Sequence, residues 1–149
     1  MNTDQSAGQV LLQTLLNAFS EGAGAAIVLF QDDAVIEFPY AASAGAPERR
    51  KMDKNAYYAH LEAGLKHMPG LKFSDLRVYP LARPGGYWAE VHGEGLIPST
   101  GNTYHQDYVI HFTLQSGKFS TYKEYWDPVA SLKAFGGAGG TQEMFNVQA

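Results

Sequence analysis

Cysteine is absent from the 149 residues. The chain therefore has no disulfide, no thiolate nucleophile and no cysteine-based metal site, and it suits a reducing compartment, so we expect a cytoplasmic location. Residues 1–5 lack a basic region followed by an apolar stretch, and no apolar run approaches the ~20 residues of a membrane span. We expect neither a signal peptide nor a membrane partner.

Charge is also scarce. Charged residues make up 17% of the chain, against a usual share of about 25%. The formal net charge is −4 and the longest basic run is Arg49-Arg50-Lys51, which provides no field for phosphates and excludes nucleic acid as an expected partner. The chain has no GxSxG, HExxH or GxxxxGK motif, so we expect no metal and no cofactor.

Aromatic residues are abundant, with nine Tyr, eight Phe and two Trp. They suit the lining of a cavity for a small molecule. The length fits one domain over residues 1–149, with a core at about 8–136 and a flexible glycine-rich tail at 137–149.

Two long segments show helical periodicity. Apolar residues recur every three or four positions in Val10–Phe19, and again in Asp53–Met68, where the stripe includes His60 and Gly64. Residues 23–30 predict a short apolar helix between them. The helices predicted here therefore number three.

Strands dominate the rest of the chain. One short strand is predicted at 34–38, and four longer ones at 71–81, 87–98, 103–115 and 118–126, separated by turn sequences such as Ser116-Gly117. Helices followed by an antiparallel meander predict an α+β fold.

Alternation along the last strands separates an inner face from an outer one. Glu124 shares its face with Tyr122 and Trp126, so a carboxyl lies between two aromatic rings. If this face lines a cavity, burial raises the pKa of Glu124 and suits it to acid–base chemistry near neutral pH. The alternative is that Glu124 points outward and pairs with a Lys or Arg.

Histidines offer two further candidates. His60 lies on the apolar stripe of its helix, where it either satisfies a hydrogen bond in the core or faces a cavity. His105, Asp107 and His111 share the outer face of one strand, but residues two and four apart along a strand span ~7–14 Å, too far to close on one metal ion. A solvated or subunit-contact face is the preferred interpretation of this second set.

The segment 22–39, with Leu29-Phe30-Gln31-Asp32-Asp33-Ala34-Val35 inside it, resembles the opening of the nuclear-transport-factor-2-like superfamily, which includes ketosteroid isomerases and SnoaL-like polyketide cyclases. This resemblance, over residues 11 to about 136, implies a cone-shaped barrel of a strongly curved sheet packed against three helices, and a homodimer. The residues of the isomerase machinery are replaced here by Thr14, Phe38 and Ile110, so steroid-type enolisation by that machinery is not expected.

The second half is most similar to the phenazine-biosynthesis A/B proteins. The similarity is carried by residues 86–95 (GYWAEVHGEG), 104–108 (YHQDY) and 123–128 (KEYWDP). It implies that Glu124 is the catalytic acid–base residue and that His60 lines the same cavity, whereas Gly64 replaces a serine of that family. The expected substrate-binding residues are Phe38, Tyr57, Gly64, Tyr108, Ile110, Phe112, Tyr122 and Trp126.

Three functional hypotheses remain open at this point. The first is an enzyme that uses Glu124 and His60 to move protons on a small hydrophobic or aromatic carbonyl compound during cyclisation, condensation, isomerisation or dehydration. The second is a binding or dimerisation module without turnover. The third is a scaffold subunit that uses the outer face around His105, Asp107 and His111.

Overall fold

A computed structural model of the chain describes residues 3–46 and 48–137. Its helices are α1 (Thr3–Ala18), α2 (Ala23–Ile27), α3 (Lys54–Leu65) and α4 (Pro128–Phe135), with short 3-10 turns η1 (Ala41–Ala44) and η2 (Glu48–Arg50). Its strands are β1 (Phe30–Glu37), β2 (Lys72–Pro80), β3 (Gly86–Ile97), β4 (Asn102–Gln115) and β5 (Lys118–Tyr125).

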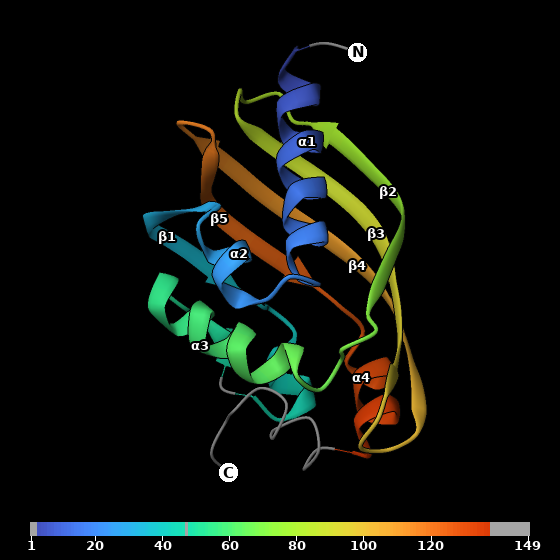
Figure 1. Cartoon of the computed structure of the whole chain (residues 1–149). Coiled ribbons are helices and arrows are strands. Elements are labelled where there is room, and N and C mark those ends of the chain that lie inside the picture. Colours follow the sequence, from blue (N-terminus) through green and yellow to red (C-terminus); the bar gives the residue numbers. More distant parts are fainter. Residues whose placement is uncertain (1–2, 47, 138–149) are drawn as a thin grey trace.

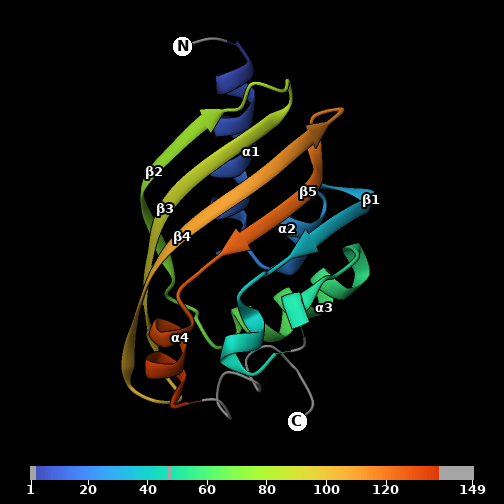
Figure 2. The same cartoon turned by 180° about the vertical axis from the view of Figure 1, so that it is seen from behind.

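The strands form one mixed sheet in the order β1-β5-β4-β3-β2. Only β1 runs parallel to its neighbour, β5, while the other pairs are antiparallel. Helices α1, α2 and α3 lie against one face of the curved sheet (Figure 1), and the strands lie in front of α1 and α2 in the reverse view (Figure 2). The α+β class is confirmed, although the sheet stays open, with β1 and β2 at its two edges, rather than closing into a barrel.

The burial of β4 follows the alternation expected from its sequence. Tyr104, Gln106, Tyr108, Ile110 and Phe112 are buried on the face toward the helices, while His105 and Asp107 are exposed on the other face. On β5, Tyr122 is buried and Glu124 is partly buried. The inner face predicted from strand parity is therefore the face that builds the core.

Helix α4 was missing from the predicted elements. Its N-cap is Asp127, whose side chain accepts a hydrogen bond from the Val129 N–H at 2.9 Å, and Pro128 occupies the first turn. Asp followed by Pro is a typical helix start, so the sequence carries a local signal for this helix. Gly136 at φ 82° ends the helix in the left-handed conformation that glycine adopts without strain.

Other boundaries differ by up to seven residues, since α1 begins at Thr3 whereas the periodic segment of the sequence begins at Val10. The second helix ends at Ile27 instead of Phe30, and β1 begins at Phe30, four residues before the predicted strand start. Residues 138–149, which carry nearly all of the predicted flexible tail, lie outside the described residues. None of the helices described is long and apolar enough to cross a membrane.

Candidate functional site

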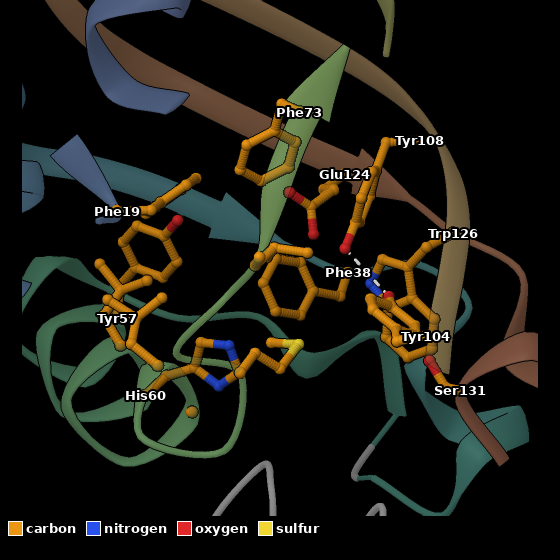
Figure 3. A pocket seen from close by; sticks show the side chains of 15 residues that line it. Phe19, Phe38, Tyr57, His60, Phe73, Tyr104, Tyr108, Glu124, Trp126 and Ser131 are labelled. Carbon is orange, nitrogen blue, oxygen red and sulfur yellow. Dashed lines mark hydrogen bonds between the residues drawn. The ribbon is translucent and has the colours of Figure 1, made fainter. Parts of the chain in front are cut away.

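A pocket of about 70 Å³ lies between the inner face of the sheet, helices α3 and α4, and Phe19, the residue that follows α1 (Figure 3). Its lining is mostly aromatic or aliphatic, with a few polar groups. The lining residues are Phe19, Phe38, Tyr57, His60, Leu61, Gly64, Leu65, Met68, Leu71, Phe73, Tyr104, Tyr108, Glu124, Trp126 and Ser131.

Glu124 projects into this pocket from β5, in register opposite Ile110 of β4 (Figure 3). Burial raises the pKa of its carboxyl to about 7, although a 3.0 Å hydrogen bond donated by the Tyr122 hydroxyl acts in the opposite direction. Desolvation outweighs the hydrogen bond because few polar groups in this cavity replace the water that a carboxylate loses. Near neutral pH both protonation states of Glu124 are populated.

His60 enters the pocket from α3. The helix starts at Asp53, whose side chain accepts a hydrogen bond from the Ala56 N–H at 2.8 Å, and its apolar stripe turns His60 inward. The imidazole packs against Phe38, at 5.2 Å between ring centroids, and stacks on Tyr57 at 6.1 Å. Burial, assisted by the positive charge of Arg50, lowers the pKa of His60 to about 3. His60 is therefore neutral at physiological pH.

A pair of tyrosines supplies further polar groups. The hydroxyls of Tyr104 and Tyr108 lie 2.9 Å apart in a hydrogen bond (Figure 3). Burial raises the pKa of Tyr104 to about 12 and that of Tyr108 well above its ordinary value. Both phenols stay protonated at neutral pH, so the pair has hydroxyl protons to donate.

Gln106 fixes the position of α4 relative to this pair. Its side-chain N–H donates to the Asp127 carbonyl at 2.9 Å, and its side-chain oxygen accepts from the Asp127 N–H at 2.8 Å. The two bonds join β4 to the start of α4, which carries Ser131 into the pocket wall. An inward polar residue in an apolar strand face thus positions one wall of the site.

Most of the residues predicted from sequence meet at this pocket. Glu124 and His60 line it together with five of the expected substrate-binding residues, which are Phe38, Tyr57, Gly64, Tyr108 and Trp126. Ile110, Phe112 and Tyr122 are buried in the core but are not among the lining residues. Tyr122 still reaches the site through its hydrogen bond to Glu124.

Eight lining residues were not singled out from the sequence. Tyr104 shares strand parity with Tyr108, and Leu61, Leu65 and Met68 belong to the stripe of His60, so these four carried a usable signal. No local pattern marks the others as neighbours of Glu124, because only the tertiary fold brings their elements together. They are Phe19, Leu71, Phe73 and Ser131.

Comparisons with known proteins agree with this architecture. Residues 12–122 match the model of the SnoaL-like domain. An uncharacterised PhzA/B-like protein of Pseudomonas aeruginosa is 30% identical over 109 residues, covering 73% of this chain and 75% of the relative. The resemblance predicted from the sequence is confirmed.

Solved structures show the same fold. A Bacillus subtilis protein named as a candidate isomerase matches with a TM-score of 0.82 at 29% identity, over 92% of this chain and 97% of that one. A Mycobacterium tuberculosis protein in complex with estradiol-17β-hemisuccinate matches with a TM-score of 0.69 at 18% identity, over 81% and 94% of the two chains. At that identity the second likeness shows the fold alone.

Proposed function

This chain belongs to the SnoaL-like domain family, and we propose that it is an enzyme that moves protons on a small hydrophobic carbonyl compound, with Glu124 as the general acid–base. The observation that carries the proposal is a pocket carboxyl whose pKa is raised to about 7. A group with this pKa accepts and returns a proton near neutral pH with little energetic cost in either direction. Cyclisation, condensation, isomerisation and dehydration all require such a step.

The tyrosine pair supports the other half of the reaction. Removing a proton from the carbon next to a carbonyl places negative charge on the carbonyl oxygen. One hydroxyl donates within the pair of Tyr104 and Tyr108, and the other is left to donate to that oxygen. Two linked phenols in an apolar pocket stabilise the developing charge better than water does, because they need no reorganisation.

His60 has a different role in this proposal from that of a charged acid. With its pKa lowered to about 3, it carries no positive charge at neutral pH. It therefore leaves the high pKa of Glu124 intact and serves as a neutral hydrogen-bonding group on the opposite wall. We assign it the orientation of the substrate rather than proton transfer.

The lining favours a neutral substrate. None of the fifteen residues around the pocket is Lys or Arg, so a carboxylate or phosphate entering it would lose hydration without a direct ionic partner. Aromatic rings on most sides fit a flat ring system. The proposed substrate class is thus a compact, uncharged carbonyl compound with aromatic or alicyclic character.

A hydrogen-exchange assay tests this function without knowledge of the natural substrate. Enolisable ring ketones such as 1-indanone and 2-tetralone are incubated with the protein in D2O, and deuterium uptake next to the carbonyl is followed by NMR. We expect exchange above the buffer rate, and a drop of roughly a hundredfold or more for Glu124→Gln. The exposed-face variant Glu90→Gln is the matched control and should retain the wild-type rate.

Two results would contradict acid–base catalysis at this site. One is exchange by Glu124→Gln at the wild-type rate, which removes the carboxyl from the mechanism. The other is the binding of these ketones, seen as a thermal shift, with no exchange above buffer.

That second result would favour a binding module, the alternative function. The mostly apolar lining supports it, and so does the steroid derivative held by a protein of the same fold. We further propose a homodimer, in keeping with the superfamily resemblance. A purely monomeric mass by analytical ultracentrifugation would exclude that assembly.

A further inference from the structure

Two histidines and two carboxylates meet on the outer face of the sheet, away from the pocket. His92 and Glu94 are two residues apart on β3, and His105 and Asp107 are two residues apart on β4, so all four side chains point to the same side. The antiparallel register places Glu94 opposite His105 and His92 opposite Asp107. Each histidine therefore faces a carboxylate on the neighbouring strand.

The cluster arises across strands rather than along one. Along a single strand, alternate side chains are ~7 Å apart, which argued against a metal site made of His105, Asp107 and His111. Directly opposite residues of paired strands have Cβ atoms only ~4.5–5.5 Å apart. The pairing of β3 with β4 therefore brings His92 and Glu94 of β3 close to His105, whereas His111 is too far along β4 to join this group.

The contacts within the cluster orient its donor atoms. His92 Nδ1 lies 2.8 Å from Asp107 Oδ1. A proton on Nδ1 donates to this carboxylate, which leaves a lone pair on Nε2, and Nε2 lies 3.8 Å from Glu94 Oε2. A cation between two acceptor atoms at this distance binds both and removes their mutual repulsion. A carboxylate that holds the remote nitrogen of a histidine is the usual support of a metal-bound imidazole.

The third donor is His105, whose Nδ1 lies 2.7 Å from Glu94 Oε1. The proton that Nδ1 shares with this carboxylate is released to solvent when the metal ion binds. Donor atoms of His92, Glu94 and His105 all lie within 4.8 Å of one another. Tetrahedral coordination with bonds of about 2.0–2.1 Å requires donor atoms about 3.3 Å apart. The side chains are partly or largely exposed, so small rotations that close the remaining distance meet little resistance.

We propose that His92, Glu94 and His105 form a binding site for Zn²⁺ or a similar divalent transition metal ion, with Asp107 as the residue that orients His92. Two imidazoles and one carboxylate are a ligand set that Zn²⁺ favours. The remaining coordination positions face solvent. This site is independent of the pocket function because it lies on the opposite face of the sheet, and a bound ion links β3 to β4.

Calorimetric titration of tag-free protein with ZnCl2 in a non-chelating buffer tests the site. We expect one Zn²⁺ per chain, with saturation by roughly 100 µM. His92→Ala, Glu94→Gln and His105→Ala should each weaken binding at least tenfold. Asp107→Asn should weaken it by roughly tenfold through the loss of the orienting contact. The matched control is His111→Ala, because His111 lies on the same face of β4 but outside the cluster.

Thermal unfolding without zinc checks that every variant folds, and these surface changes should leave Tm within about 2 °C of the wild type. Wild-type binding too weak to saturate at 1 mM Zn²⁺ would overturn the proposal. Equal loss in His111→Ala and His92→Ala would also overturn it, because the ion would then be held by scattered surface histidines.

Discussion

Replacement of Glu124 by Gln should change how the free energy of unfolding depends on pH. In the unfolded chain this carboxyl titrates near its ordinary pKa of 4.5, whereas burial raises its pKa to about 7 in the folded protein. Between these values the folded state binds one proton more than the unfolded state, so stability falls as pH rises. The slope is about 1.4 kcal/mol per pH unit, which gives a total loss of about 3 kcal/mol by pH 7.

His60 produces the opposite slope. Its ordinary pKa of 6.5 is lowered to about 3 on folding, so between these values the unfolded chain binds the extra proton and stability rises with pH. The two windows overlap between pH 4.5 and pH 6.5. In this range the contributions of Glu124 and His60 to the pH dependence of stability cancel in the wild type. The two groups together therefore leave the free energy of unfolding independent of pH.

Variants with a single substitution separate the contributions of Glu124 and His60 to stability. Urea unfolding of the wild type and Glu124→Gln at a series of pH values from 4 to 8 yields the difference in unfolding free energy at each pH. We expect this difference to shift in favour of the variant by about 3 kcal/mol between pH 4.5 and pH 7, because glutamine has no proton to lose. His60→Gln should instead show stability that falls steadily over the same range.

A pH-independent difference would refute the reasoning. If Glu124→Gln and the wild type differ by a constant amount within about 0.5 kcal/mol, the carboxyl keeps its ordinary pKa and the pocket does not desolvate it. The acid–base role would then lose its physical basis, even if the substitution reduced activity.

Two other predictions concern the surroundings of Glu124. Tyr122→Phe removes the hydrogen bond that lowers the pKa of the Glu124 carboxyl. The midpoint of the NMR titration of Glu124 should therefore move above the wild-type value. An unchanged or lower midpoint would contradict the assigned contact. Gly93→Ala places a Cβ 2.8 Å from the Tyr108 ring and 3.4 Å from Phe73. Displacement of these rings should lower the free energy of unfolding by about 1–3 kcal/mol and reduce the affinity for ketones. Wild-type values in both measurements would show that the two rings move aside without cost.

Local patterns were sufficient for most of the secondary structure. The stripe in α3 and the alternation in β4 and β5 are periodic signals that follow directly from helix and strand geometry. The helix Pro128–Phe135 is not among the predicted elements because its eight residues are too few for a strong periodic signal. Its start signal, Asp127-Pro128, was nevertheless available in the sequence.

The candidate site could be predicted in part for the same reason. Parity placed Glu124 on the same face as Tyr122 and Trp126 but left open whether that face points inward, and periodicity placed His60 on the buried stripe. Both patterns depend only on neighbours in sequence. Neither pattern carries information about distance between elements. Phe73 from β2 and Ser131 from α4 join the pocket only through the packing of the sheet and helices.

The outer face shows the same limit. Along one strand, residues two and four apart are separated by ~7–14 Å, which argues against a metal site made of His105, Asp107 and His111. The pairing of β3 with β4 then brings Glu94 opposite His105, a relation set by register between strands. Register is fixed by how whole strands bury their apolar faces, so no short motif encodes it.

By itself, the sequence determined which face of β4 is apolar, which stripe of α3 is buried, and that Glu124 shares its face of β5 with two aromatic rings. Only the tertiary structure decided that Glu124 loses enough water to raise its pKa to about 7 and that His60 stays neutral nearby. The physical reason is that desolvation depends on all the atoms that surround a group in space. Those atoms come from strands and helices far apart along the chain.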